Sequence, residues 1–243
     1  VITETHGSTP RKVGSKMLVL TNGKIIGSIG GGHLEKKVIE DALTIIETGG
    51  ASCFEHALVY DHEMCCGGRL TIYIEAISPK KNLYIFGAGH IGKALAEIAV
   101  ELDFNVVVID ERQELISSID HPFVKQINLP HQKALSQLSF RLDDMVAVIT
   151  HDHAYDREII ACCGKFQLAY LGMIGSRRKV EVSKNIFLEN ERLSKEEMKF
   201  IDWPMGLDIK AQRPKEIAIS ILAKLIQVRA ELKKQKRISS VSK

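Results

Sequence analysis

The feature that most constrains the fold is the hexapeptide Gly87-Ala88-Gly89-His90-Ile91-Gly92, which has the spacing G-x-G-x-x-G. It follows an apolar segment and opens a helical pattern, and the next apolar segment ends at an aspartate. This is the context of a dinucleotide-binding βαβ unit, in which glycines approach a pyrophosphate and an acid reaches a ribose. In the alternative interpretation, the glycines only allow close packing of strand and helix. The residues predicted to contact a nucleotide such as NAD(P) are Gly87, Gly89, His90, Gly92 and Asp110.

Beyond residue 80, short apolar segments alternate with helical patterns, which is typical of a doubly wound parallel sheet. The last helix is predicted to begin at Pro214, because proline is favoured at the first helical position. The predicted strands are 83–86, 105–109, 145–149 and 169–173, and the predicted helices before the last are 90–102, 132–138, 155–163 and 177–189.

The first 79 residues follow a different pattern. A hairpin is predicted over 15–30, because Asn22-Gly23 supplies the positive φ angles of a tight turn. A helix over 33–48 and strands near 52–59 and 69–77 follow, before a linker over 78–82. The predicted fold class is therefore α/β, with a small N-terminal α+β domain (1–79) followed by a Rossmann-like domain (80–232).

Charge and cysteine usage exclude several classes of protein. The net charge is +3, but five basic residues and no acid lie in 233–243, which is predicted to be a disordered tail. The rest of the chain is slightly acidic, which argues against nucleic-acid binding, and no apolar run is long enough to span a membrane. The cysteines are Cys53 and two adjacent pairs, which favours reduced thiols and a cytoplasmic location.

Three N-terminal motifs suit an anionic ligand that contains a sulfur-loving atom. Gly7–Arg11 and Gly27–Glu35 each place a glycine- or proline-rich turn after an apolar run, and the second leads into a helix. Backbone N–H groups at such a turn bind anions. The third motif, Cys65-Cys66-Gly67-Gly68-Arg69, adds thiols beside an arginine that favours the thiolate.

Two polar turns follow predicted strands of the second domain, at the end where parallel sheets bind ligands. Thr150–His153, with Asp156, offers His151 and His153 to a ligand crevice or a metal, although capping by Asp152 is an alternative. Gly175–Lys179 starts a helix with three cations, which indicates a bound anion or a solvated basic face. Cys162-Cys163 is predicted to lie in the core.

Taken together, these residues resemble the XdhC/CoxI family of accessory proteins for xanthine dehydrogenase and related molybdenum hydroxylases. The resemblance covers essentially the whole chain. It rests on ordered motifs at Gly7–Arg11, Gly14–Met17, Gly27–Glu35, Cys66–Arg69, Ile85–Gly92, Thr150–Asp156, Gly172–Lys179, Pro204–Asp208 and Pro214–Ser220. This chain departs from the family at Lys210, where glycine is usual, at Arg213, where threonine is usual, and at Lys215, which replaces a common acid.

The resemblance implies a cytoplasmic, dimeric maturation factor rather than an enzyme. Such a protein binds and protects the molybdenum cofactor (molybdopterin), supports its sulfuration with a cysteine desulfurase, and inserts it into an apo-xanthine dehydrogenase or related hydroxylase. The functional cysteine of the family falls on Cys66, as a soft ligand for molybdenum. Further contacts are expected from Arg11, Gly30, Gly31, Gly32, Glu35, Cys65, Gly67, Gly68, Ser176, Arg177 and Arg178.

Two other functions fit parts of the sequence. The candidate catalytic residues are Cys66, His151 and His153. An NAD(P)-dependent oxidoreductase would use Gly87–Gly92 and Asp110 with His151 and His153. It would leave the N-terminal motifs without a role. A structural adaptor between desulfurase and hydroxylase would function without the Cys66 thiol.

Overall fold

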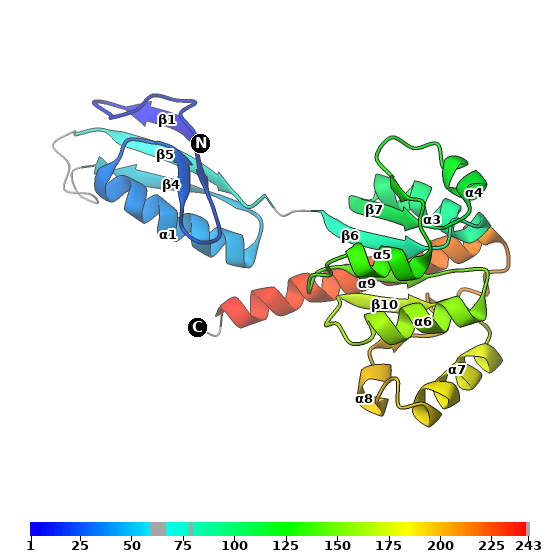
Figure 1. The fold of residues 1–243 in the computed structure, drawn as a ribbon. Coiled ribbons are helices and arrows are strands. Elements are labelled where there is room, and N and C mark those ends of the chain that lie inside the picture. The colour runs from blue at the N-terminus through cyan, green and yellow to red at the C-terminus, as the bar shows by residue number, and fades with distance from the viewer. Residues whose placement is uncertain (59–66, 78–79, 242–243) are drawn as a thin grey trace. The chain divides into compact units, whose positions relative to one another are not determined.

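The computed structural model describes residues 1–58, 67–77 and 80–232, together with the backbone of 233–241 (Figure 1). The chain divides into two compact units, with Val1–Pro79 in the first and Lys80–Leu232 in the second. Each unit has its own apolar core, so each is described by itself.

The first unit is a three-stranded antiparallel sheet with one helix and a hairpin. The sheet order is β1 (Ile2–His6), β5 (Arg69–Glu75), β4 (Ala51–Ala57). The hairpin pairs β2 (Met17–Val19) with β3 (Ile25–Gly27), and α1 (Gly32–Thr48) follows it. Side chains alternate along β5, and those on its buried face pack against one stripe of α1. The shared core includes Leu70, Ile72 and Ile74 of β5 with Leu34, Val38 and Ala42 of α1.

The second unit is a six-stranded parallel sheet in the order β11-β10-β9-β6-β7-β8, with helices between the strands. Its strands are β6 (Lys81–Phe86), β7 (Phe104–Ile109), β8 (Lys125–Ile127), β9 (Met145–Val148), β10 (Tyr170–Met173) and β11 (Ile201–Asp202). Its helices are α3 (His90–Glu101), α4 (Gln113–Ser117), α5 (His131–Gln137), α6 (His153–Cys163), α7 (Arg177–Glu189), α8 (Lys195–Met198) and α9 (Pro214–Val241).

Both faces of this sheet are covered, which explains its almost continuous apolar strands. On β6, Leu83 and Ile85 face the core formed with α3 and α9, whereas Tyr84 and Phe86 face the core formed with α6 and α7. Figure 1 shows α9 on one side of the sheet and α5 and α6 on the other.

The strand order reverses at β6. The chain proceeds from β6 to β7 and β8 on one side, then returns to β9 on the other side of β6. The loops after β6 and β9 therefore diverge, and an open α/β sheet forms its ligand crevice at such a point. The glycine loop after β6 and the Thr150 turn after β9 flank it.

The predicted fold class is confirmed, and the predicted helix over 177–189 coincides with α7. Sequence analysis missed α4, β8, α8 and β11, which are too short for a periodic pattern to emerge. The tail prediction needs correction, because α9 continues through residues 233–241. That segment is rich in Lys, Arg and Gln, which favour helix. Within the described residues, no helix is both long and apolar enough to cross a membrane.

The two outer glycines of the hexapeptide are required by packing. A methyl group at Gly92 would lie 1.9 Å from the Gly87 carbonyl oxygen, whereas one at Gly89 would meet nothing within 4 Å. We expect Gly92→Ala to destabilise the second unit by about 3 kcal/mol, because the backbone must move apart. Gly89→Ala is the matched control, with an expected loss below about 1 kcal/mol from a poorer helix cap.

The measurement is urea unfolding followed by tryptophan fluorescence. Trp203 is the one tryptophan of the sequence and lies in the second unit, so its signal reports on that unit. Equal losses for the two variants would contradict the packing argument.

Candidate functional site

The glycine loop between β6 and α3 brings two strand ends together. Gly87 has φ +117°, and a side chain there would collide with the Ile149 carbonyl, 2.2 Å from an added methyl group. Gly89 precedes α3, and His90 is the exposed first residue of that helix. The packing interpretation therefore holds for Gly87 and Gly92, while Gly89 borders open space.

Asp110, at the end of β7, is saturated with hydrogen bonds from the protein. Its Oδ2 accepts from the Ala88 N–H at 2.7 Å and from Arg112 Nη2 at 2.7 Å. Its Oδ1 accepts from the Arg112 N–H at 3.0 Å and from Nε at 2.9 Å. A carboxylate offers about four acceptor positions, so none is left for a ribose. Asp110 therefore fixes the loop, and its contact with a nucleotide stays a prediction.

These bonds also set the charge state of Asp110. Burial alone would raise the pKa of this carboxyl, but the hydrogen bonds from Arg112 and Ala88 outweigh burial and hold the pKa below its usual value. Asp110 is thus ionised at neutral pH, and its charge is matched by the Arg112 guanidinium.

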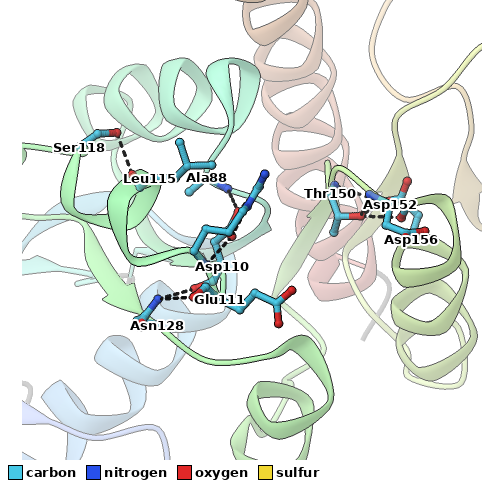
Figure 2. A network of polar contacts seen from close by, with 10 residues as sticks. Ala88, Asp110, Glu111, Leu115, Ser118, Asn128, Thr150, Asp152 and Asp156 are labelled. Atoms are coloured by element: carbon cyan, nitrogen blue, oxygen red, sulfur yellow. Dashed lines mark hydrogen bonds and ion pairs between the residues drawn. The ribbon is translucent and has the colours of Figure 1, made fainter.

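The crevice is shallow, with a cavity volume of about 20 Å³. Figure 2 shows one wall, where Asn128 donates to the backbone carbonyls of Asp110 and Glu111, both at 3.0 Å. The sequence did not predict Glu111, Leu129, His131 and Tyr155 as lining residues, although each lies within two residues of a strand end or a helix start at this edge of the sheet. The full lining is Phe86, Gly87, Ile109, Asp110, Glu111, Leu129, His131, Thr150, His151 and Tyr155.

Three rings form a row along the opposite wall. The centroid of the Tyr155 ring lies 4.4 Å from that of His131 and 5.6 Å from that of His151. His131 is buried, and its Nε2 lies 2.7 Å from Glu158 Oε2. The hydrogen bond to His131 lowers the pKa of Glu158. His131 and Tyr155 are thus held in place, whereas His151 is exposed at the crevice mouth.

The Thr150 turn is organised by a buried aspartate. Asp156 Oδ1 accepts from the Thr150 N–H at 3.0 Å and from its hydroxyl at 2.7 Å (Figure 2). Its Oδ2 accepts from Lys179 Nζ at 2.7 Å. His153 begins α6, with Nδ1 3.8 Å from the same Oδ2, and Asp152 caps the helix as the alternative interpretation predicted.

A metal site at this turn finds no support, because no group of three or more His, Cys, Asp or Glu among the described residues is placed to hold an ion. The crevice position of His151 agrees with the sequence analysis, and its catalytic role, like that of His153, stays a prediction.

The second polar turn presents fewer free cations than predicted. Ser176 caps α7 by accepting from the Lys179 N–H at 3.3 Å. Lys179 turns inward to Asp156, while Arg177 and Arg178 are exposed. Arg177 lines a hollow with the segment that follows β11. An anion at Ser176, Arg177 and Arg178 stays a prediction.

Lys210, in that same segment, has a backbone conformation typical of glycine. Its φ is +59°, in the left-handed region that side chains disfavour. Asp208 compensates, because its Oδ2 accepts from Lys210 Nζ at 2.7 Å and its Oδ1 from the Lys210 N–H at 3.3 Å. The departure at Lys210 thus keeps the local backbone that glycine adopts readily.

In the first unit, the three N-terminal motifs meet at one end of the sheet. Arg69 pairs with His6 across β1 and β5, and a methyl group at Gly68 would lie 2.3 Å from the Ser8 carbonyl oxygen. One at Gly30 would lie 2.6 Å from the Pro10 ring. The glycines therefore allow these segments to approach each other.

The glycine loop before α1 already holds an anion of this chain. Glu35 Oε1 accepts from the Ser28 hydroxyl at 2.6 Å and from the N–H groups of Ile29 and Gly31, both at 3.0 Å. Burial opposes ionisation of Glu35, yet these bonds lower its pKa overall. Glu35 therefore fixes the loop, and its contact with a ligand stays a prediction.

Several other residues that are predicted for this site are exposed or border open space. Arg11 and Gly67 are exposed, and a methyl group at Gly31 or Gly32 would meet nothing within 4 Å. Cys65 and Cys66 lie outside the described residues, directly before Gly67 in the chain. Of the described thiols, Cys53 is exposed and Cys163 is buried, as the core prediction for that pair requires, whereas Cys162 is half-buried.

Two family models match this chain. Residues 83–225 match the XdhC Rossmann domain, and residues 1–60 match the XdhC and CoxI family. The first match covers the described second unit almost completely, and the second covers the first two N-terminal motifs.

Two further proteins are similar in sequence, and one solved structure is similar in fold. An uncharacterized protein of Escherichia coli K12, YqeB, is 33% identical over 94% of this chain and 42% of its own length. A protein of Bacillus subtilis 168 that is described as a probable subunit of xanthine dehydrogenase is 33% identical over 65% of this chain and 46% of its own length. The matches thus span less than half the length of these two relatives. A solved structure described as a xanthine dehydrogenase from Bacillus halodurans has the same fold, with TM-score 0.56, 23% identity, and coverage of 95% of this chain and 90% of its own.

The bonds of Asp110 give stability with a defined pH dependence. We expect Asp110→Asn to lose about 2 kcal/mol at pH 7, because it weakens a charge-assisted hydrogen-bond set. Since the folded pKa is depressed, this contribution is present above the ordinary value of about 3.9 and disappears as pH falls through the folded pKa. The gap between wild type and Asp110→Asn should therefore shrink below about pH 4.

Urea unfolding at pH 7 and at pH 3, read by Trp203 fluorescence, measures this gap. Asp103→Asn, which removes an exposed ion pair with Lys80, is the control and should be close to neutral at both pH values. A gap for Asp110→Asn that stays constant to pH 3 would disprove the assignment.

Lys210 offers a stabilising substitution. We expect Lys210→Gly to raise the free energy of unfolding by about 0.5 kcal/mol, because relief of a left-handed backbone exceeds the added entropy of the unfolded chain. Lys224→Gly, within α9, should instead lose about 1 kcal/mol. Thermal unfolding compares the two, and a less stable Lys210→Gly protein would rule out the strain argument.

Proposed function

We propose that this chain, which belongs to the XdhC and CoxI family, is a maturation factor that binds the molybdenum cofactor for a xanthine dehydrogenase-type hydroxylase. The observation that carries the proposal is the meeting of the three N-terminal motifs at one end of the first unit. Segments that are far apart in sequence lie side by side, because Gly68 closely approaches the Ser8 backbone and Gly30 closely approaches the Pro10 ring.

The residues at this place fit such a cofactor. When bound, the cofactor supplies a molybdenum centre on a dithiolene and a negatively charged phosphate. Arg11 is an exposed cation. Gly31 and Gly32 border open space, which allows a ligand to approach their backbone. Cys66, one residue before Gly67, supplies a soft thiolate suited to molybdenum.

Glu35 limits which backbone N–H groups of the glycine loop can bind a ligand. Because its carboxylate occupies the N–H groups of Ile29 and Gly31, the phosphate is held chiefly by Arg11 and by the backbone beyond Gly31. The loop is then a rigid support for the ligand. This support keeps its shape whether or not the cofactor is bound.

The proposed function requires a client enzyme and a source of sulfur. The client is an apo-xanthine dehydrogenase or a related molybdenum hydroxylase, and a cysteine desulfurase provides sulfur for the cofactor. The protein acts in the cytoplasm as a homodimer that binds without turnover. The Bacillus subtilis relative, with its description as a probable xanthine dehydrogenase subunit, supports a hydroxylase client.

The test is anaerobic binding of molybdenum cofactor to purified full-length chain. Wild type should bind near one cofactor per chain, and Cys66→Ala should bind at least tenfold more weakly because the soft ligand is lost. Cys53→Ala is the matched control, since Cys53 is an exposed thiol of β4 in the same unit.

Each outcome decides the proposal. Equal retention by wild type and Cys66→Ala would remove Cys66 from the site, and no binding by folded wild type would overturn the function itself. An equal loss in Cys53→Ala would indicate a general thiol effect and also count against Cys66.

A further inference from the structure

The hollow beside Arg177 has no role in the proposed cofactor site of the first unit. It lies in the second unit, where the chain leaves β10 at Ile174 and where the segment 204–211 follows β11. Its cavity volume is about 610 Å³, which is within the range of small-molecule sites, about 300–1,000 Å³. None of its described lining residues lines the crevice beside the glycine loop, so the hollow is a separate place on the sheet.

Most of the surface inside the hollow is apolar. Met205 is buried, whereas Leu207 is 37% exposed and Ile209 is 49% exposed. An apolar group that enters the hollow would remove this surface from water, which favours binding. The apolar lining residues are Ile174, Pro204, Met205, Leu207, Ile209, Ala211 and Ile217.

Arg177 brings an uncommitted cation to the hollow. It is an exposed lining residue, and within the described part of the chain its guanidinium forms no hydrogen bond or ion pair. The pKa of Asp208 is lowered chiefly by the hydrogen bond from the Lys210 side chain, and the charge of Arg177 adds to this effect. The planar guanidinium can bind two oxygens of a carboxylate or a phosphate at once.

Lys210 adds a second cation and holds it in an unfavourable backbone conformation. Its φ is +59°, a conformation that glycine would adopt without strain. Its side chain lines the hollow, with Nζ 2.7 Å from Asp208 Oδ2. Backbone strain of this kind occurs at residues whose side chains have a function. Lys210 supplies a positive charge that glycine could not.

The charges that line the hollow favour an anion. They belong to two cations, Arg177 and Lys210, and to one acid, Asp208. Both oxygens of Asp208 accept hydrogen bonds from Lys210, so the repulsion of an anion by this acid is offset by its partner. The charge of Arg177 remains for a ligand. An apolar lining with a net positive charge suits a molecule that joins an anionic group to an apolar body.

We propose that this hollow binds a small organic anion, whose carboxylate or phosphate is held by Arg177 and Lys210 and whose apolar body packs against the lining from β10, β11 and α9. The site goes beyond the proposed function and does not depend on it, because every residue that it uses belongs to the second unit.

The experiment is isothermal titration of the full chain with 1-naphthyl phosphate and 1-naphthoate, which carry the two kinds of anionic group on one apolar body. Neutral 1-naphthol lacks the charge, and inorganic phosphate lacks the apolar body. We expect at least one of the organic anions to bind about tenfold more tightly than either reference compound. The tighter of the two identifies the anionic group, and the wild-type comparison does not depend on the folding of a variant.

Arg177→Gln tests the uncommitted cation. It should weaken binding of the organic anion about tenfold and leave the binding of 1-naphthol unchanged. Arg213→Gln is the matched control, because Arg213 is an exposed arginine of the same region that does not line the hollow. Its effect should be less than about twofold, since exposed charges at a distance are screened. Trp203 fluorescence confirms that each variant is folded.

Two further variants should change the affinity in opposite directions. Lys210→Gly should weaken binding of the organic anion about threefold, although the same variant is expected to be more stable than wild type. Asp208→Asn should strengthen binding about threefold, because it removes the one acid of the lining and leaves both cations. A gain in affinity cannot result from loss of the fold.

The following results would overturn the proposal. They are no binding of either organic anion to folded wild type at millimolar concentration, equally tight binding of 1-naphthol or inorganic phosphate, and wild-type affinity in Arg177→Gln. An equal loss in Arg213→Gln would indicate a general effect of positive charge and would also count against the site. Unchanged affinity in Lys210→Gly, or weaker binding by Asp208→Asn, would contradict the charge argument.

Discussion

The shape of the crevice depends on the hydrogen bonds and the ion pair that the Asp110 carboxylate forms. Its bond to the Ala88 N–H ties the glycine loop after β6 to the end of β7, and its pair with Arg112 fixes the segment that leads to Glu111. This bond acts together with the Gly87 N–H, which donates to the Ile109 carbonyl at 2.8 Å and joins the same two segments. A charged group only 8% exposed is stable here because every acceptor position is satisfied.

The same device recurs at other functional turns. Glu35 binds N–H groups of the loop before α1, Asp156 binds the Thr150 N–H, and Asp202 accepts from the Gly206 N–H at 2.9 Å. In each case a side-chain carboxylate satisfies backbone donors that a glycine-rich or polar turn leaves unpaired. These turns are therefore held in shape by the chain itself, and a ligand meets a preorganised surface.

Sequence patterns predict where most helices and strands lie, but they do not predict which donors each carboxylate binds. The hexapeptide and the alternation after residue 80 predict the parallel sheet because periodicity and glycine spacing are local properties. Whether a carboxylate is free depends on donors that folding brings to it. Lys179 reaches Asp156 from the next helix, and Ser28 closes on Glu35 only after the loop turns. The sequence therefore identified the turns that contain Asp110 and Glu35, but not the hydrogen bonds that their carboxylates accept within the chain.

Because these carboxylates already bind the backbone of their own turns, other residues are needed to recognise a ligand there. Where a turn already holds a carboxylate, a ligand's negative group must be met by an exposed cation, and Arg11, Arg177 and Arg178 are the exposed arginines next to such turns. Recognition thus shifts from the residues that define the motif to those one or two positions away. These neighbours can vary without disturbing the fold, so related chains can share both glycine loops and still differ in the ligands they bind.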